Sequence, residues 1–484
     1  MSPTQSDPIK HVVLLVLENH SFDQMLGCFQ GLFPEVEGVD PNNFRNNDDG
    51  FGNTIHQSEM RETQMLHDPV HEHPDVLEQL SNDNSGFVRN FTKHYPNSSL
   101  EERQAIMGFY PLDFLPALHT LARSFTICDH WFSSLPGPTW PNRFFALSGT
   151  CSGDVEMLPA TDAQAVGNVF SVQSQDTIFD RLEEAGKRWN IFYYDIASSL
   201  LLDNMRRPEM SSKYEKIDKF FKVCAQSEET VPDFIFIEPK YYGLDQNDDH
   251  PPHNVMKAQK LVADVYNALR SNEALWESTL FVIFYDEHGG FYDHVQPPKA
   301  VPPDDKTQVY GFDQLGVRVP ALLVSPWVER RVEKTEFDHT SFLKYLIEKW
   351  SLRPLTARST AANSISCALR LHKRDDTPQF IRVPYADLIP SHPGWELSDI
   401  SVHHSAFDRL ADRLLNTYGE AAELAALRDA IEAQGAWLKL KARLGSRLVS
   451  WGYRWSKPAV DKAENKASAL FQALSGLGAV SAKR

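Results

Sequence analysis

The sequence predicts an α/β fold in which helices cover both faces of a central, mostly parallel sheet. Short, continuous apolar runs recur along the chain, as expected of strands that are buried on both faces. Amphipathic helical patterns lie between these runs, and such alternation favours a parallel sheet. The 484 residues, of which 42% are hydrophobic and 23% charged, supply ample material for the core of a large globular domain.

The elements can be placed in chain order. The predicted strands are five apolar runs: His11–Leu17, Ile191–Tyr194, Phe234–Ile237, Leu280–Tyr285 and Val319–Val324. Two amphipathic patterns, Lys257–Ser271 and Thr340–Trp350, predict helices. Two segments rich in Asn, Asp, Gly and Pro, Gly38–Gly52 and Gly243–Asn254, predict loops.

After about residue 395 the pattern becomes wholly helical, following a stretch that contains Pro and Gly. We therefore expect a catalytic domain over residues 1–395 and a helical tail over residues 396–484. Residues 431 to 484 contain ten Lys and Arg residues but only three acidic residues, which gives this segment a net charge of +7. One apolar stripe recurs at helical spacing within this tail: Trp437, Leu440, Leu444, Leu448 and Trp451. Such a helix suits a peripheral membrane surface, its own catalytic domain or a homo-oligomer contact.

Composition excludes several classes of protein. The net charge of -17 argues against nucleic acid as a partner, since nucleic-acid binding normally needs a basic face. Five scattered cysteines without a C-x-x-C pair predict neither a disulfide framework nor a thiolate zinc site. No apolar run is long enough to span a membrane. The first residues lack the basic region of a signal peptide, so we expect a cytoplasmic protein or one exported by a non-classical route.

Polar side chains follow two of the predicted strands directly. Glu18 and Asn19 come after the first strand, and Asp286 and Glu287 come after Leu280–Tyr285. Ligands bind at the carboxyl ends of strands in open parallel sheets, so these four side chains should meet there. Carboxylates held so close repel unless a cation or proton lies among them. Oxygen ligands alone suit magnesium, calcium or manganese, whereas added imidazoles favour zinc.

Thr139 is the candidate nucleophile. It precedes a helical pattern, and Pro141 places it near the helix start, where backbone amides and the helix dipole favour an anion such as phosphate. A neighbouring cation would activate its hydroxyl, and Asn142 and Arg143 could hold non-bridging phosphate oxygens. A plain capping role for Thr139 is the alternative.

Several histidines lie beside acidic residues and prolines, a context that fixes an imidazole for metal binding or proton transfer. They occur in the segments Asp68-Pro-Val-His71, Asp249-His250, Asp293-His294 and Asp338-His339.

Five separated motifs stand out along the chain: Glu18-Asn-His-Ser-Phe-Asp23, Thr139-Trp-Pro-Asn-Arg143, Asp286-Glu-His-Gly-Gly-Phe-Tyr-Asp-His-Val295, Gly316-Val-Arg-Val-Pro320 with Ser325-Pro-Trp327, and Asp338-His-Thr340. Together they resemble the phosphoesterase family of phospholipases C and acid phosphatases, in the alkaline-phosphatase-like superfamily. The resemblance covers about residues 10–350, and it is greatest to the zinc-dependent phosphatidylcholine phospholipases C of Gram-negative bacteria.

The resemblance implies a three-layer alkaline-phosphatase-like fold and roles for particular residues. Glu18, Asn19, Asp286 and Glu287 match metal-binding positions, and Thr139 matches a Ser or Thr nucleophile. His71, His250 and His339 match histidines around the phosphate. We expect His71 to add to the metal ligands and His339 or His250 to act as the acid. His20 stands where the family usually has Arg, which changes the charge near the site and could recruit another zinc.

We therefore expect a metal-dependent phosphoric diester hydrolase, with Zn²⁺ as the cofactor, that cleaves glycerophospholipids such as phosphatidylcholine. The alternative is a broad-specificity acid phosphatase, since the same nucleophile and metal serve either ester. A non-catalytic, membrane-associated protein is a further alternative, although it would not need the complete set of site residues.

Overall fold

The computed structural model describes residues 7–157, 175–194, 197–241 and 246–388. The predicted tail, with its apolar stripe, lies outside the described residues. None of the helices in those four ranges has the length and apolar character needed to cross a membrane.

One large sheet organises the molecule and confirms the predicted fold class. Its strand order is β12-β6-β11-β10-β1-β9-β7-β8. Only β11 pairs antiparallel to its neighbours β10 and β6; the other pairs are parallel. The strands are β1 (His11–Leu17), β6 (Thr126–Cys128), β7 (Trp189–Tyr193), β8 (Tyr214–Lys216), β9 (Phe234–Glu238), β10 (Thr279–Tyr285), β11 (Ala321–Val324) and β12 (Arg331–Glu333).

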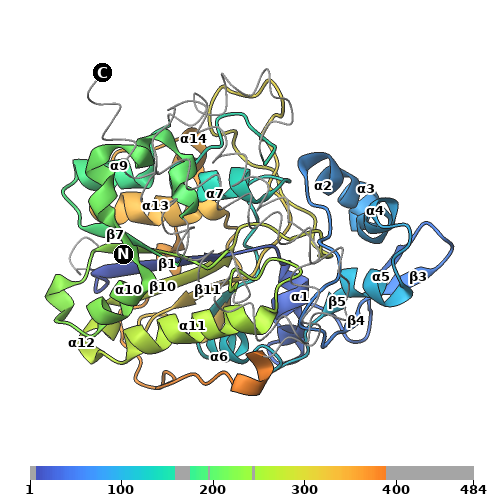
Figure 1. Cartoon of the computed structure of the whole chain (residues 1–484), viewed down its shortest axis with the longest axis horizontal. Helices are drawn as coiled ribbons and strands as arrows, with labels where there is room; N and C mark the ends of the chain where they lie inside the picture. The colour runs from blue at the N-terminus through green and yellow to red at the C-terminus, as the bar shows by residue number, and fades with distance from the viewer. Residues whose placement is uncertain (1–6, 158–174, 195–196, 242–245, 389–484) are drawn as a thin grey trace, which may run out of the picture.

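Helices cover both faces of this sheet, as predicted. Figure 1 shows α7, α9, α13 and α14 on one face and α6, α10, α11 and α12 on the other. The bounds are α6 (Pro116–Ser124), α7 (Thr139–Ser148), α9 (Ile178–Glu184), α10 (Ile217–Cys224), α11 (Val255–Arg270), α12 (Glu273–Trp276), α13 (His339–Trp350) and α14 (Ala357–Ala361).

A smaller unit, which the sequence analysis did not predict, lies at one end of the sheet (Figure 1). Three of its helices contribute to a second small core that includes Val76, Phe87, Phe91 and Ile106. It contains β2 (Asn46–Asp48), β3 (Thr54–His56), β4 (Ser58–Glu59), β5 (Gly108–Phe109), α2 (His73–Gln79), α3 (Ser81–Asn84), α4 (Phe87–His94) and α5 (Leu100–Ile106). The short α1 (Phe22–Leu26) follows β1 and lies nearby. Short 3-10 turns complete the connections: Gly27–Gly31, Ser198–Leu201, Asp203–Arg206, Pro208–Lys213, Glu228–Thr230, Ile365–Ala368 and Tyr385–Leu388.

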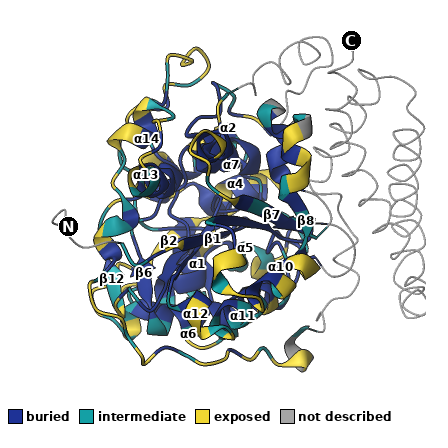
Figure 2. Cartoon of the chain, turned by 90° about the vertical axis from the view of Figure 1, so that its left-hand side faces the viewer, coloured by how far each residue is buried: buried dark blue, intermediate teal, exposed yellow. Residues whose placement is uncertain are grey.

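Burial explains why the strand prediction succeeded. Every residue of β1 and β10 is buried, so both faces of these central strands are apolar. Figure 2 shows the central strands in dark blue, between helices whose outer faces are exposed.

Candidate active site

The two predicted metal-binding pairs meet at the carboxyl edge of the sheet. β1 and β10 are parallel neighbours, and their last residues, Leu17 and Tyr285, are register partners. Glu18 and Asp286 therefore leave the sheet at the same level. The Asn19 amide donates a hydrogen bond to Asp286 Oδ1 at 3.3 Å, which ties the two segments together.

A close backbone approach fixes this junction. Asn19 has a φ of +63°, a left-handed conformation that Asn tolerates better than most residues. Gly289 also has a positive φ, and a Cβ at that position would lie 2.1 Å from the Asn19 carbonyl oxygen. Gly289 thus allows the segment after Asp286 and Glu287 to fold directly against Asn19.

Thr139 lies beside this junction. It is the first residue of α7, with Pro138 rather than Thr139 as the N-cap, and its side chain is fully buried. Its hydroxyl donates to Asn19 Oδ1 at 3.3 Å. The helix start offers fewer amides for an anion than the sequence suggested, because the Trp140 amide donates to Met157 Sδ and Pro141 has none.

Arg143, one turn into α7, is surrounded by carboxylates. Its Nη2 lies 3.0 Å from Glu18 Oε1, its Nε 2.9 Å from Asp286 Oδ2 and its Nη1 3.3 Å from Glu238 Oε2. The guanidinium is 2% exposed, so these are buried ion pairs. The expectation that Arg143 holds phosphate oxygens does not fit these contacts, since its nitrogens are already committed to protein groups.

Asn142 does not reach the junction either. Its Oδ1 accepts from the Leu135 amide, and its Nδ2 donates to the carbonyls of Leu135, Gly137 and Pro138. The expected phosphate contact is therefore replaced by a structural one. Asn142 fixes the turn that leads into Thr139.

Burial opposes ionisation of the acidic residues at the site, although Arg143 partly offsets this effect at Glu18 and Asp286. Burial raises the pKa of Glu18 and of Asp286, against the lowering effect of Arg143. Burial also raises the pKa of Glu287 to about 8, and the nearby Asp286 charge adds to the effect. Within the described ranges, Glu287 Oε1 is buried without a hydrogen-bond partner. A cation bound among these carboxylates would remove the repulsion and satisfy that oxygen. The residues present thus fit a divalent metal.

The Nε2 atom of His71 is directed toward Asn19 and Glu287. Its Nδ1 lies 2.7 Å from the Pro69 carbonyl oxygen, to which it donates, so Nε2 is left as an acceptor. That Nε2 lies 3.2 Å from Asn19 Nδ2 and 3.7 Å from Glu287 Oε1. Burial alone would lower the pKa of His71, but neighbouring carboxylates, Glu287 foremost, raise it.

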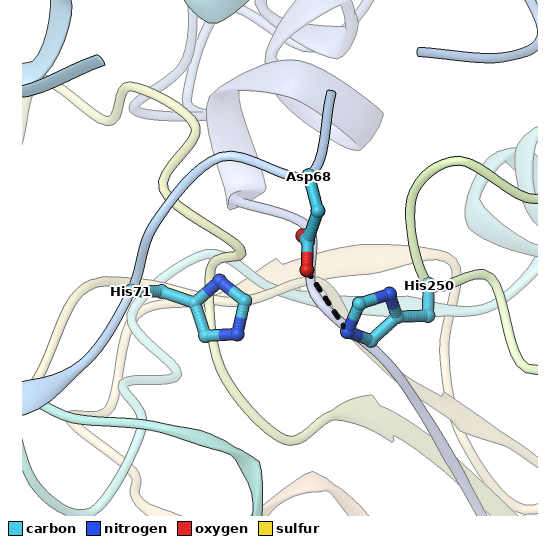
Figure 3. Close-up of side chains that lie close together, drawn as sticks. All are labelled: Asp68, His71 and His250. Atoms are coloured by element: carbon cyan, nitrogen blue, oxygen red, sulfur yellow. Dashed lines mark ion pairs between the residues drawn. The ribbon is translucent and has the colours of Figure 1, made fainter. Parts of the chain in front are cut away.

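His250 and Asp68 complete a second group of possible metal ligands with His71. One potential ligand atom from each residue lies within 4.8 Å of the others. Figure 3 shows the Asp68 carboxylate between the two imidazole rings. His250 Nδ1 bonds the Pro251 carbonyl, and its Nε2 lies 3.8 Å from Asp68 Oδ2.

His339 lies behind Asp286 and has both ring nitrogens occupied. The Trp131 indole can only donate, so His339 Nδ1 accepts from it at 3.2 Å. Nε2 then carries the proton and donates to the Asp286 carbonyl at 2.7 Å. Burial lowers the pKa of His339 to about 4. The expectation that His339 acts as the acid does not fit, because it holds the Asp286 backbone as a neutral ring.

His20 also lacks the extra metal role considered for it. Its Nδ1 lies 2.6 Å from Gln24 Oε1 and its Nε2 2.9 Å from the Asp249 carbonyl oxygen. The ring stacks on Phe291, and burial lowers its pKa to about 4. It serves to anchor the loop that carries His250.

From the sequence, Asp68 was named only as an acidic neighbour of His71, without a role of its own, and Glu238 was missed. Glu238 follows the apolar run Phe234–Ile237 directly, which is the same signal that identified Glu18 and Asp286. The rule that selected Glu18 and Asp286, an acidic residue directly after a buried apolar run, could therefore have selected Glu238 as well.

Comparison with known proteins identifies the family of this chain. The model of the phosphoesterase family matches residues 9–353, the greater part of the chain. The chain belongs to the phosphoesterase family. The matched range ends before the predicted tail and includes every candidate site residue.

Curated relatives bear the name phospholipase C. The chain is 34% identical over 410 residues to non-specific phospholipase C3 of Arabidopsis thaliana, covering 78% of this chain and 76% of that protein. It is 27% identical to the non-hemolytic phospholipase C of Burkholderia pseudomallei, covering 71% and 55% of the two chains. These relatives and the family confirm the expected class of enzyme, a phosphoric diester hydrolase.

Solved structures of similar architecture are more distant. A protein of the alkaline phosphatase superfamily from Vibrio parahaemolyticus aligns over 75% of this chain and 74% of its own, at 11% identity and a TM-score of 0.32. At that level of similarity the details of the site come from this chain alone.

Proposed function

We propose that this enzyme is a divalent-metal-dependent phospholipase C that cleaves glycerophospholipids, such as phosphatidylcholine, into diacylglycerol and a phosphorylated headgroup. The observation that carries the proposal is the hydrogen bond from the buried Thr139 hydroxyl to Asn19, where the Glu18–Asn19 and Asp286–Glu287 pairs meet. The names of the relatives support a phospholipid substrate.

Glu18, Asn19, Asp286 and Glu287 would hold the metal, with His71 beside them. The imidazole among the oxygen ligands favours Zn²⁺ over magnesium or calcium. The bound ion would supply Lewis-acid chemistry: it would favour the alkoxide of Thr139 and withdraw charge from the phosphoryl group.

The side chains of the chain itself carry out the remaining steps. The Thr139 oxygen attacks phosphorus, the bond from phosphorus to the glycerol oxygen breaks, and the departing alkoxide takes a proton. His250 donates that proton, since its Nε2 faces the Asp68 carboxylate, which stabilises the protonated ring. Water then cleaves the phosphothreonine, which releases the phosphorylated headgroup and restores the threonine.

Replacing the nucleophile tests the mechanism. We expect Thr139→Ala to retain less than about 1% of the wild-type turnover of p-nitrophenyl phosphorylcholine, because loss of a nucleophile costs orders of magnitude. Thr139→Ser keeps a hydroxyl and is the matched control. Metal content, measured by elemental analysis, should be equal in all three proteins. Activity of Thr139→Ala well above that level, with metal bound, would exclude a covalent threonine intermediate.

The type of ester is tested by substrate comparison. A phospholipase C should cleave p-nitrophenyl phosphorylcholine at a higher kcat/KM than p-nitrophenyl phosphate, and should release diacylglycerol from phosphatidylcholine vesicles. The reverse preference, without diacylglycerol release, would identify the phosphomonoesterase alternative.

A further inference from the structure

Three neighbouring strands each deliver a carboxylate to the site, and one of the three has no role in the mechanism above. β9, β1 and β10 lie side by side, and Glu238, Glu18 and Asp286 stand at their carboxyl ends. All three side chains are buried. Arg143 bridges them, with one contact to each at 3.3 Å or less.

We propose that Glu238 is a positioning residue for the metal centre and that it acts through Arg143. The inference rests on the proposed metal-dependent function, and it concerns a residue that contacts the guanidinium rather than the metal.

The contacts of Glu238 make it a fixed acceptor rather than a ligand. Oε1 accepts from the Ser198 hydroxyl at 2.7 Å and from the Ser199 amide at 3.4 Å. Oε2 accepts from the Tyr241 hydroxyl at 2.6 Å and from Arg143 Nη1 at 3.3 Å. Both oxygens are thus directed at protein donors, away from the Glu18 and Asp286 carboxylates.

Tyr241 strengthens the hold on the guanidinium. Its hydroxyl accepts from Arg143 Nη1 at 2.8 Å while it donates to Glu238. Glu238 and Tyr241 thus both bind Nη1 of Arg143. Its Nη2 and Nε contact Glu18 and Asp286. This orientation holds the two metal-binding carboxylates at a fixed separation.

The charge of Glu238 also favours cation binding. Arg143 is shared among three buried carboxylates. An amide in place of Glu238 would leave the whole guanidinium charge to Glu18 and Asp286. Those two carboxylates would then be better neutralised without a metal, and their attraction for a divalent cation would fall.

The test is the affinity of the chelator-treated, full-length protein for Zn²⁺, measured by isothermal titration calorimetry. We expect Glu238→Gln, which keeps the shape of the side chain, to raise the Kd about tenfold or more, the usual effect of losing a partner of a metal ligand. Tyr241→Phe, a milder change, should raise the Kd in the same direction.

Glu333→Gln is the matched control. Glu333 is also a buried carboxylate with an Arg partner, Arg331, but it stands on β12 at the far edge of the sheet. Its substitution should leave the Kd for Zn²⁺ unchanged.

An unchanged Kd in Glu238→Gln would overturn the inference, as would an equal rise in Glu333→Gln. If Glu238→Gln does not fold, as judged by circular dichroism, an unchanged Kd in Tyr241→Phe overturns it instead. Absence of Zn²⁺ binding and of metal-dependent activity in the wild type would reject the proposed function as well. If the wild type binds Zn²⁺ tightly and Glu238→Gln has the same Kd, only the role of Glu238 would be rejected.

Discussion

At the scale of single residues, His339 and His250 occupy different environments although both follow an acidic residue in the sequence. His339 is enclosed between the Trp131 indole and the Asp286 carbonyl, and burial holds its pKa near 4. His250 has one nitrogen bonded to the Pro251 carbonyl and the other beside the Asp68 carboxylate. Of these two rings, only that of His250 has a nitrogen beside a carboxylate, which is why the proposed proton transfer is assigned to it.

This difference predicts opposite results for two similar substitutions. His250→Gln should lower kcat about 10²- to 10⁴-fold, the usual contribution of a general acid, and should remove the limb of the pH–rate profile that reports its ionisation. His339→Gln should retain at least about a tenth of the activity with an unaltered profile, because glutamine can donate to the Asp286 carbonyl and accept from Trp131.

Metal content separates two roles of His250. The Asp68, His71 and His250 group also satisfies the spacing of a cation site. Loss of bound metal in His250→Gln would identify His250 as a ligand and contradict the proton-donor assignment. Equal losses of activity in the two variants would contradict the role given to His339.

The sequence predicted the identity of many side chains at the site but not their orientation. Glu18 and Asp286 could be placed because strand ends set their position. Asn142 and Arg143 were misjudged because adjacent helix residues point in different directions, and burial then decides which protein groups each one must satisfy.

At the scale of elements, the start of α7 depends on one side chain. Asn142 satisfies the carbonyls of Leu135, Gly137 and Pro138 together with the Leu135 amide. The turn contains two prolines, which lack amide hydrogens and cannot pair these carbonyls themselves. Asn142 thus determines where Thr139 begins the helix.

Asn142→Ala should therefore destabilise the protein by about 2–3 kcal/mol, because buried polar groups lose their partners. It should also lower kcat more than it raises KM, since Thr139 would lose its fixed position. Urea unfolding and steady-state kinetics measure the two effects. Asn190→Ala is the control: its half-buried Nδ2 donates one bond, to the Lys213 carbonyl, so the loss should be smaller and kcat unaltered. A stable Asn142→Ala enzyme would contradict this view of the turn.

Element prediction succeeded where burial was uniform. The predicted strand His11–Leu17 is β1 with the same bounds. The predicted helix Lys257–Ser271 corresponds to α11, which begins two residues earlier and ends one residue earlier. The strands β6, β8 and β12 were missed because three residues are too few to show a period, and their sheet position comes from pairing with distant segments. The antiparallel direction of β11 likewise depends on the connection around it, which no local pattern encodes.

At the scale of the whole molecule, the buried acidic residues couple stability to pH. Burial raises the pKa of Glu287 to about 8 from an ordinary value of 4.5. The folded state therefore binds this proton more tightly than the unfolded state, so its stabilising effect is complete below pH 4.5 and is lost as the pH rises through 8.

The chelator-treated protein should consequently have a lower Tm at pH 9 than at pH 6, as measured by differential scanning calorimetry. Zn²⁺ should remove most of this decline, because it replaces the proton at the carboxylate. Glu287→Gln, with an amide that does not titrate, should show a smaller decline without metal. A steeper decline in that variant would contradict the assignment of the effect to Glu287.

The wide separation of the site residues along the chain has a consequence for biosynthesis. Glu18 and Asp286 meet because β1 pairs with β10, a strand made more than two hundred residues later. A nascent polypeptide still on the ribosome, and not yet extended past Glu287, lacks two of the four side chains proposed to hold the metal. If the enzyme depends on a metal as proposed, its ion can bind only after translation is well advanced, and shortened translation products that stop before this point should be inactive.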